Sequence, residues 1–165
     1  MSKLYSIKCR QSGEGAVDDW DGQILFDENG SFEGICNAQS EYKFGRALIF
    51  GCFYEDQTLE LFRIPLLYFS QPLLLRGRKK GYDFTGDIYM KVCEGMMPCG
   101  AFDVTLIDRA AGFPESAIEA RKQELKNEIE ELKTYSENAR MYYDNFTRAR
   151  SKIPAGTRIS LHVGK

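Results

Sequence analysis

Two arginines are the residues of this sequence whose type and position best suit ligand binding. Arg46 lies in one strongly apolar segment, 43–54, and Arg63 lies in the next, 58–64. Both segments have the composition of β-strands. Two guanidinium groups within an apolar row would hold a carboxylate or a phosphate through charge-assisted hydrogen bonds. The sequence therefore predicts an anion-binding pair, provided that the strands bring the two side chains together.

The register of the hairpin between these strands decides whether the two arginines meet. A two-residue turn at 56–57 would set Tyr54 opposite Leu59 and would place both arginines on one face of the sheet. A different register would separate them, and either side chain could instead extend its charged end into solvent. Trp20 is a third candidate, because a tryptophan beside a strand either covers the mouth of a barrel or packs in the core.

Catalytic residue types are scarce in this chain. Its single histidine, His162, stands near the last residue, so no Ser-His-Asp or Cys-His combination is evident. No glycine-rich phosphate-binding loop is present, and the five cysteines lack the spacing of zinc ligands. Pairs of carboxylates stay an open alternative, because their pairing is spatial. We therefore expect no catalytic residue, no metal and no cofactor, with an enzyme as the alternative interpretation.

Charge and hydropathy exclude further classes of function. A formal net charge of −2 over 165 residues does not suit a polyanionic partner. The basic run 76–81 is expected to form a solvated turn rather than a nucleic-acid site. No apolar run reaches the ~18–20 residues of a membrane span, and the first ten residues lack the apolar core of a signal peptide. The odd number of cysteines fits free thiols in a reducing compartment, so we expect a cytoplasmic protein without a membrane or nucleic-acid partner.

Residues 1–112 are expected to form one antiparallel β domain. About seven or eight short apolar segments follow one another, joined mostly by short turns such as Asp-Glu-Asn-Gly at 27–30. A meander of that size closes into a barrel or folds into a sandwich. Phe-x-Gly occurs at 32–34 and 84–86, and glycine at such a place often marks a sharp bend in a strand. The arrangement resembles small up-and-down barrels of the calycin kind, such as lipocalins and avidins, in fold alone, without any family motif.

Residues 113–165 are expected to form a long amphipathic helix over about 116–152 and a final strand over about 157–163. Ser116 and Glu119 have the spacing of a capping box at the start of the helix. Apolar or small residues recur along one face, most of them at seven-residue spacing. The candidate interface residues are Ile118, Leu125, Ile129, Leu132, Ala139, Tyr143 and Phe146.

The length of this helix predicts a partner for it. At ~1.5 Å per residue it would span roughly 55 Å, whereas the β domain should be only about 35 Å across. Either helices of two or more chains pair as a coiled coil, or the helix breaks near 135–138 and folds back. The regular spacing favours the coiled coil over the fold-back, and hence a homo-oligomer. The polar and small residues within the apolar face, such as Lys122 and Ser136, argue against a long independent zipper, so we expect the helix to pack partly on the sheet of its own or a neighbouring chain.

Together these features predict a non-enzymatic binding or interaction module, assembled through its helix. Its ligand would be a protein partner or an apolar small molecule. The alternative is a small-molecule carrier or enzyme that uses the barrel interior for an apolar or anionic ligand, oriented by Arg46 and Arg63.

Overall fold

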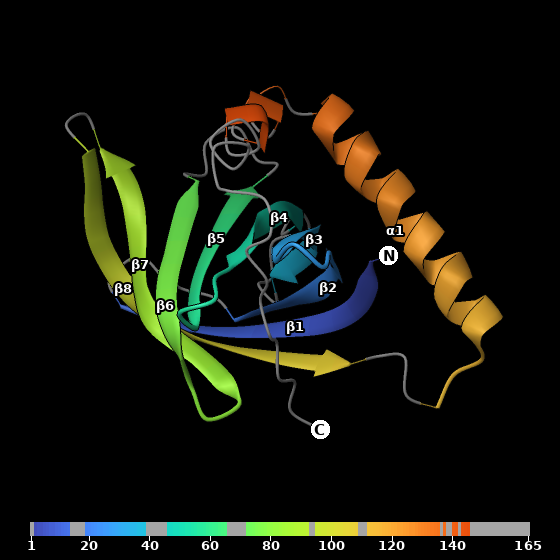
Figure 1. Ribbon diagram of the computed structural model, residues 1–165. Helices are drawn as coiled ribbons and strands as arrows, with labels where there is room; N and C mark the ends of the chain where they lie inside the picture. The colour runs from blue at the N-terminus through green and yellow to red at the C-terminus, as the bar shows by residue number, and fades with distance from the viewer. Residues whose placement is uncertain are drawn as a thin grey trace.

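Eight antiparallel strands close into a barrel, and one helix lies against its outer surface (Figure 1). The computed structural model describes residues 2–13, 19–38, 46–65, 72–92, 95–108, 112–135, 137, 140, 141 and 143–145. The strands are β1 Lys3–Ser12, β2 Trp20–Phe26, β3 Ser31–Ala38, β4 Arg46–Phe53, β5 Thr58–Pro65, β6 Leu73–Lys80, β7 Asp83–Val92 and β8 Gly95–Asp108, and the helix is α1 Glu115–Tyr135.

The barrel closes where β1 pairs with β8, from Tyr5 opposite Asp108 to Ser12 opposite Ala101. Every other pair joins strands that are consecutive in the sequence. The predicted antiparallel meander is therefore confirmed, and of the two expected architectures the barrel is the one that forms. The predicted tight turn at 27–30 is also confirmed, because Gly30 donates its backbone N–H to the carbonyl of Asp27 at 2.9 Å.

Apolar side chains from all eight strands fill the barrel interior. Its buried members are Tyr5, Ile7, Cys9, Trp20, Ile24, Phe26, Phe32, Cys36, Ala47, Ile49, Phe53, Leu59, Leu61, Leu75, Phe84, Ile88, Phe102, Val104 and Leu106. Phe53 lies at the centre of an aromatic cluster, with ring centroids 5.0 Å from Phe32, 5.0 Å from Phe84 and 5.7 Å from Phe26. This cluster packs the end of the barrel where the tight turns 27–30 and 54–57 lie, which we call the Phe53 end.

Two strand glycines that the sequence singled out lie in close contact with the backbone of a neighbouring strand. A Cβ added to Gly34 would stand 2.0 Å from the carbonyl oxygen of Gln23 on the neighbouring strand. One added to Gly86 would stand 2.4 Å from the Cα of Gly77, its cross-strand partner. Real Cβ atoms do not approach backbone atoms so closely, so these positions admit glycine alone without movement of the strands.

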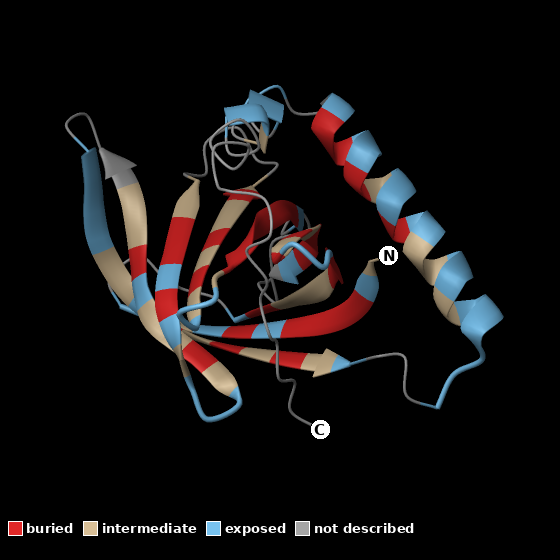
Figure 2. Cartoon of the chain, in the orientation of Figure 1, coloured by how far each residue is buried: buried red, intermediate tan, exposed pale blue. Residues whose placement is uncertain are grey.

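Helix α1 covers the outer face of β2, β3 and β4, and the buried stripe of the helix faces the barrel (Figure 2). Leu125, Ile129 and Leu132 are buried there. They pack with the outward-facing residues Leu4, Leu25, Ile35, Leu48, Phe50 and Ile64. Strand β4 is consequently covered on both faces, as its two-sided apolar pattern predicted.

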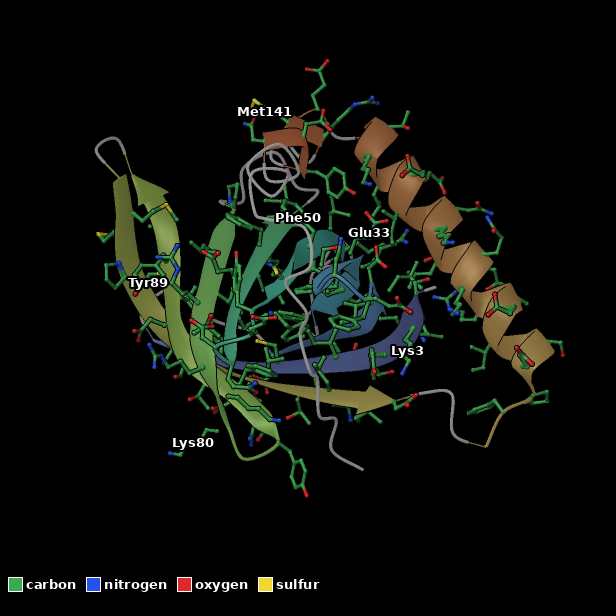
Figure 3. The ribbon with its side chains drawn as sticks, viewed as in Figure 1. Lys3, Glu33, Phe50, Lys80, Tyr89 and Met141 are labelled. Atoms are coloured by element: carbon green, nitrogen blue, oxygen red, sulfur yellow. The ribbon has the colours of Figure 1, made fainter. Side chains whose placement is uncertain are left out.

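The helix is shorter than the predicted 116–152, because α1 ends at Tyr135. Lys133 Nζ lies 3.5 Å from the ring centroid of Tyr143, which also contacts Phe50 with ring centroids 5.4 Å apart. The two contacts place the Tyr143 side chain beside the end of α1 and against the outer face of β4. Figure 3 shows Met141 on a separate helical segment over the barrel, beyond the end of α1.

Of the other residues predicted to form the helix interface, some lie within the described part of the chain and some lie outside it. Ile118 is partly exposed on the first turns of α1 and is not a member of the cluster beneath the helix. Ala139, Phe146 and the predicted strand 157–163 lie outside the described residues. Because Leu125, Ile129 and Leu132 pack on the chain's own barrel, any coiled coil would have to use other positions of the helix.

A buried cation fastens the end of α1 to the barrel. Lys133 Nζ donates to Glu33 on β3 at 3.1 Å and to Glu130 at 3.2 Å, beneath the ring of Tyr143. Burial lowers the pKa of Lys133, but the charge of Glu33, the nearby Tyr143 and the hydrogen bonds to Glu33 and Glu130 together outweigh burial, and the pKa lies above its usual value. The lysine therefore stays charged at neutral pH, and it joins α1, strand β3 and the side chain of Tyr143 at one point.

The expected turn at 76–81 is wrong, since residues 73–80 form strand β6. Arg76, Arg78 and Lys80 of this strand are exposed. Arg76 donates two hydrogen bonds to Glu60 on β5, at 2.8 and 3.2 Å, and lies opposite Asp87 on β7. Acidic residues of the neighbouring strands therefore offset part of the positive charge of this surface.

Candidate functional site

Arg46 and Arg63 lie on opposite faces of the barrel wall. Ile49 pairs with Arg63 and Phe53 pairs with Leu59, so the register differs by one residue from the predicted one. A shift of one residue moves a side chain to the other face of a sheet. The prediction that the two arginines share a face is therefore wrong, and each arginine defines a separate candidate site.

The turn between β4 and β5 explains the difference in register. It contains a Gln57 with a φ of 68°, in the left-handed region that non-glycine residues seldom adopt. The backbone N–H of Gln57 donates to the carbonyl of Tyr54 at 3.0 Å, and the N–H of Tyr54 donates to the carbonyl of Thr58 at 2.9 Å. Tyr54 thus opposes Thr58 rather than Leu59.

Arg63 points into the barrel, toward the end opposite to the aromatic cluster. This end, which we call the Trp20 end, is formed by the last residues of β1, β3 and β5 and the first residues of β2, β4 and β6. The guanidinium group lies within hydrogen-bonding reach of the Cys36 thiol and close to Cys9. The Nε of Arg63 is buried and has no hydrogen-bond partner within the ranges that the structure describes.

The two thiols beside Arg63 do not balance its charge. Burial raises the pKa of Cys36 to about 11, although the nearby Arg63 guanidinium opposes this shift. Burial likewise raises the pKa of Cys9, and the Cys36 sulfur adds to the effect. Both thiols are therefore protonated at neutral pH. They are free, as predicted, as are Cys52 and Cys99, and a neutral thiol is only a weak acceptor for a guanidinium donor.

Trp20 is part of the packed interior at the same end. Its side chain is 1 % exposed, and its indole N–H donates to the Gln11 side-chain oxygen at 2.9 Å. It lies opposite Cys9 on the neighbouring strand. The core interpretation of Trp20 fits this placement, and contact with a ligand remains a prediction.

Arg46 lies on the outer surface beneath α1. Its Nη2 is 3.7 Å from Glu128 Oε2 on the helix, a distance that allows electrostatic attraction but is too long for a hydrogen bond. Arg46 also borders a polar cleft between the helix and the barrel. The structure thus assigns one arginine to the interior and the other to the helix interface.

The described part of the chain contains neither a metal-binding cluster nor a membrane-spanning helix. Within it, no three His, Cys, Asp or Glu side chains gather in a way that could hold a metal ion. None of its helices combines the length and the hydropathy needed to cross a membrane.

Sequence reasoning missed the neighbours of both arginines. The alternation of β3 places Cys36 on the inner face, but which residue of β5 it meets depends on the register, which the sequence did not reveal. Lys8, Asp21 and Asn37 near Arg46 come from three different strands and share no local motif. Comparison of the chain with protein-family models, with curated proteins and with solved structures found no match.

Proposed function

We propose that the protein is a non-enzymatic binding module that holds a small apolar molecule with one anionic group at the Trp20 end of the barrel. The anionic group would lie against Arg63. The observation that carries this proposal is the buried Arg63 Nε, which lacks a hydrogen-bond partner among the described residues. The neighbouring buried residues, Ile49, Leu61 and Trp20, would contact the apolar part of the ligand.

The unsatisfied donor of Arg63 supports an anionic ligand. The Arg63 side chain is partly buried, and its Nε is buried without an acceptor among the described residues. A buried donor left without an acceptor costs about 1–3 kcal/mol. A carboxylate or phosphate that reached Arg63 would remove this cost, so the site favours an anion over a neutral molecule of the same shape. The likeness to calycin barrels, which is one of fold, suits a ligand held at a barrel end but does not identify it.

The surroundings of Arg63 favour binding over catalysis. The nearest nucleophilic groups are the Cys36 and Cys9 thiols, whose raised pKa values keep them protonated at neutral pH. No histidine or carboxylate within the described residues lies in hydrogen-bonding contact with either thiol. A protonated thiol without a base is a poor nucleophile.

Thermal unfolding with and without ligands tests the proposal. Fatty acids serve as the panel, and a ligand at a hundred times its Kd should stabilise the protein by about 2.7 kcal/mol. For a chain of this size that corresponds to a rise in Tm of about 5–10 °C. The Arg63→Met variant should lose this response, whereas Arg46→Met, which removes an arginine from the outer surface, should keep it.

The same variants give a result without any ligand. If the guanidinium is unpaired in the free protein, Arg63→Met should leave stability unchanged or raise it by about 1–4 kcal/mol. A marked loss of stability in this variant would show that the chain itself already pairs the charge. That result, or a panel that leaves Tm unchanged, would contradict the proposal.

Self-association through the helical region is a second proposal. It rests on two exposed apolar side chains, one just before α1 and one beyond its end: Phe113 is 60 % exposed and Met141 is 51 % exposed. Light scattering should report a dimer or higher oligomer for the full chain, and Phe113→Ser with Met141→Ser should reduce it to a monomer. A monomeric full-length protein at high concentration would rule this proposal out.

A further inference from the structure

A polar cleft of about 290 Å³ lies between α1 and the outer face of the barrel. It is distinct from the site at Arg63, because its floor is formed by outward-facing side chains of β1 to β4. Arg121, Leu125 and Glu128 of the helix form its other wall. Its volume is close to the lower limit for sites that bind small molecules.

The floor of the cleft is a continuous polar row across four strands. Lys8 opposes Asp21, Asp21 opposes Asn37, and Asn37 opposes Arg46. The next row toward the Phe53 end contains Ser6, Gln23 and Ile35, before the surface becomes apolar beneath the helix. The cleft therefore begins where the apolar contact between α1 and the barrel ends.

Interactions within the protein fix the helical wall of the cleft. Arg121 donates to Gln23 at 2.7 Å, to Glu124 at 3.0 Å and to Glu128 at 3.2 Å. Glu128 is thereby neutralised by Arg121 and oriented toward the barrel. Its attraction for Arg46 acts over 3.7 Å and leaves the guanidinium donors of Arg46 without a hydrogen bond among the described residues.

Three donor groups in the cleft are consequently available to a ligand. The side chains of Lys8 and Asn37, like that of Arg46, make no hydrogen bond with any residue in the described ranges. Lys8 and Arg46 carry two positive charges, which the Asp21 carboxylate of the same row offsets in part. Asn37 lies next to Arg46 on the adjacent strand with an amide N–H₂ to donate. Gln23 and Ser6 add uncharged polar groups suited to hydroxyls. These polar walls do not suit a lipid.

We propose that this cleft binds a small phosphorylated sugar or polyol, with its phosphate held by Arg46 and Asn37 and attracted by Lys8. A guanidinium group matches the geometry of a phosphate with two parallel hydrogen bonds, and a dianion gains from both cations. The hydroxyls of the ligand lie along Ser6 and Gln23, in the row next to the polar row.

Amide chemical shifts of the full chain, followed during titration with glucose 6-phosphate, test this proposal. The residues whose signals move should be those of the polar row, 8, 21, 37 and 46. Arg46→Gln removes a charge-assisted hydrogen-bonded contact and should therefore weaken binding about tenfold to a hundredfold. Arg78→Gln, which removes an exposed arginine on the other side of the barrel, should leave the Kd unchanged.

Further ligands and one variant separate this site from others. Glucose should cause no shift changes and inorganic phosphate weaker ones, if both parts of the ligand are bound. The Arg63→Met variant should bind glucose 6-phosphate like the wild type, because Arg63 is inside the barrel. Shift changes that are absent at the polar row, or that survive unchanged in Arg46→Gln, would overturn the proposal, as would equal binding of glucose.

Discussion

Replacement of Phe53 by alanine is expected to lower the free energy of unfolding by about 3–5 kcal/mol, the range for truncating a fully buried aromatic side chain. Phe53 is 1 % exposed and contacts three other phenylalanine rings, at centroid distances from 5.0 to 5.7 Å. Its removal would leave a cavity lined by rings from β2, β3 and β7. These rings are held on separate strands of a closed barrel, so they cannot move together to fill the space.

Urea denaturation followed by circular dichroism measures this loss. The control is Tyr82→Ala, which removes an aromatic side chain from a position that is 67 % exposed, and which should change stability by less than about 0.5 kcal/mol. Because a domain typically has only 5–15 kcal/mol of stability in total, Phe53→Ala should stand out clearly. If the two variants were equally stable, the aromatic cluster would not be the main support of the Phe53 end.

Local signals in the sequence were sufficient to predict most of the barrel. The two-residue alternation of β1, β4 and β7 identified those strands, and Asn29-Gly30 identified a tight turn. Strand β6 was missed because its outward residues are arginines and lysines, which resemble a turn when read alone. Their partners, such as Glu60 for Arg76, lie on another strand, 16 residues away. Charge pairing across strands has no signature within a short window of sequence.

The helix illustrates a different limit. Leu125, Ile129 and Leu132 have the same spacing whether the helix packs against a second helix or against a sheet. The sequence therefore identified the buried face but not what covers it. The two-sided apolar pattern of β4 indicates that the helix packs on the barrel, because Leu48 and Phe50 face outward and would otherwise be exposed to water. A comparison of the two patterns would have favoured the chain's own barrel.

The sequence indicated that Arg46 and Arg63 lie in apolar strands, and the structure places both there. It did not indicate their faces, because a single residue of register decides whether the two side chains share one. That register depends on Gln57 adopting a φ of 68°, a conformation that the residue type does not indicate. The partners of Arg63 within the barrel follow from this turn, whereas the row that ends at Arg46 follows from the registers between β1, β2, β3 and β4.

Gly86→Ala is expected to destabilise the barrel by more than about 3 kcal/mol, beyond the usual range for overpacking a core. The added Cβ would lie 2.1 Å from the carbonyl oxygen of Arg76 and 2.4 Å from the Cα of Gly77. Both are backbone atoms of the paired strand β6, so no side chain can rotate to make room. The strands must separate, and the hydrogen bonds between β6 and β7 must weaken, in a barrel that is closed and cannot open at an edge.

A second glycine distinguishes this steric effect from a conformational one. Gly81 has a φ of 65° and no atom within 4 Å of an added Cβ, so Gly81→Ala costs only the left-handed backbone conformation, about 1–2 kcal/mol. Urea denaturation should therefore rank Gly86→Ala well below Gly81→Ala, and failure of Gly86→Ala to fold would agree with this ranking. A Gly86→Ala variant as stable as Gly81→Ala would mean that β6 and β7 tolerate separation at this bend. The curvature of the barrel would then not depend on the close contact of Gly77 and Gly86.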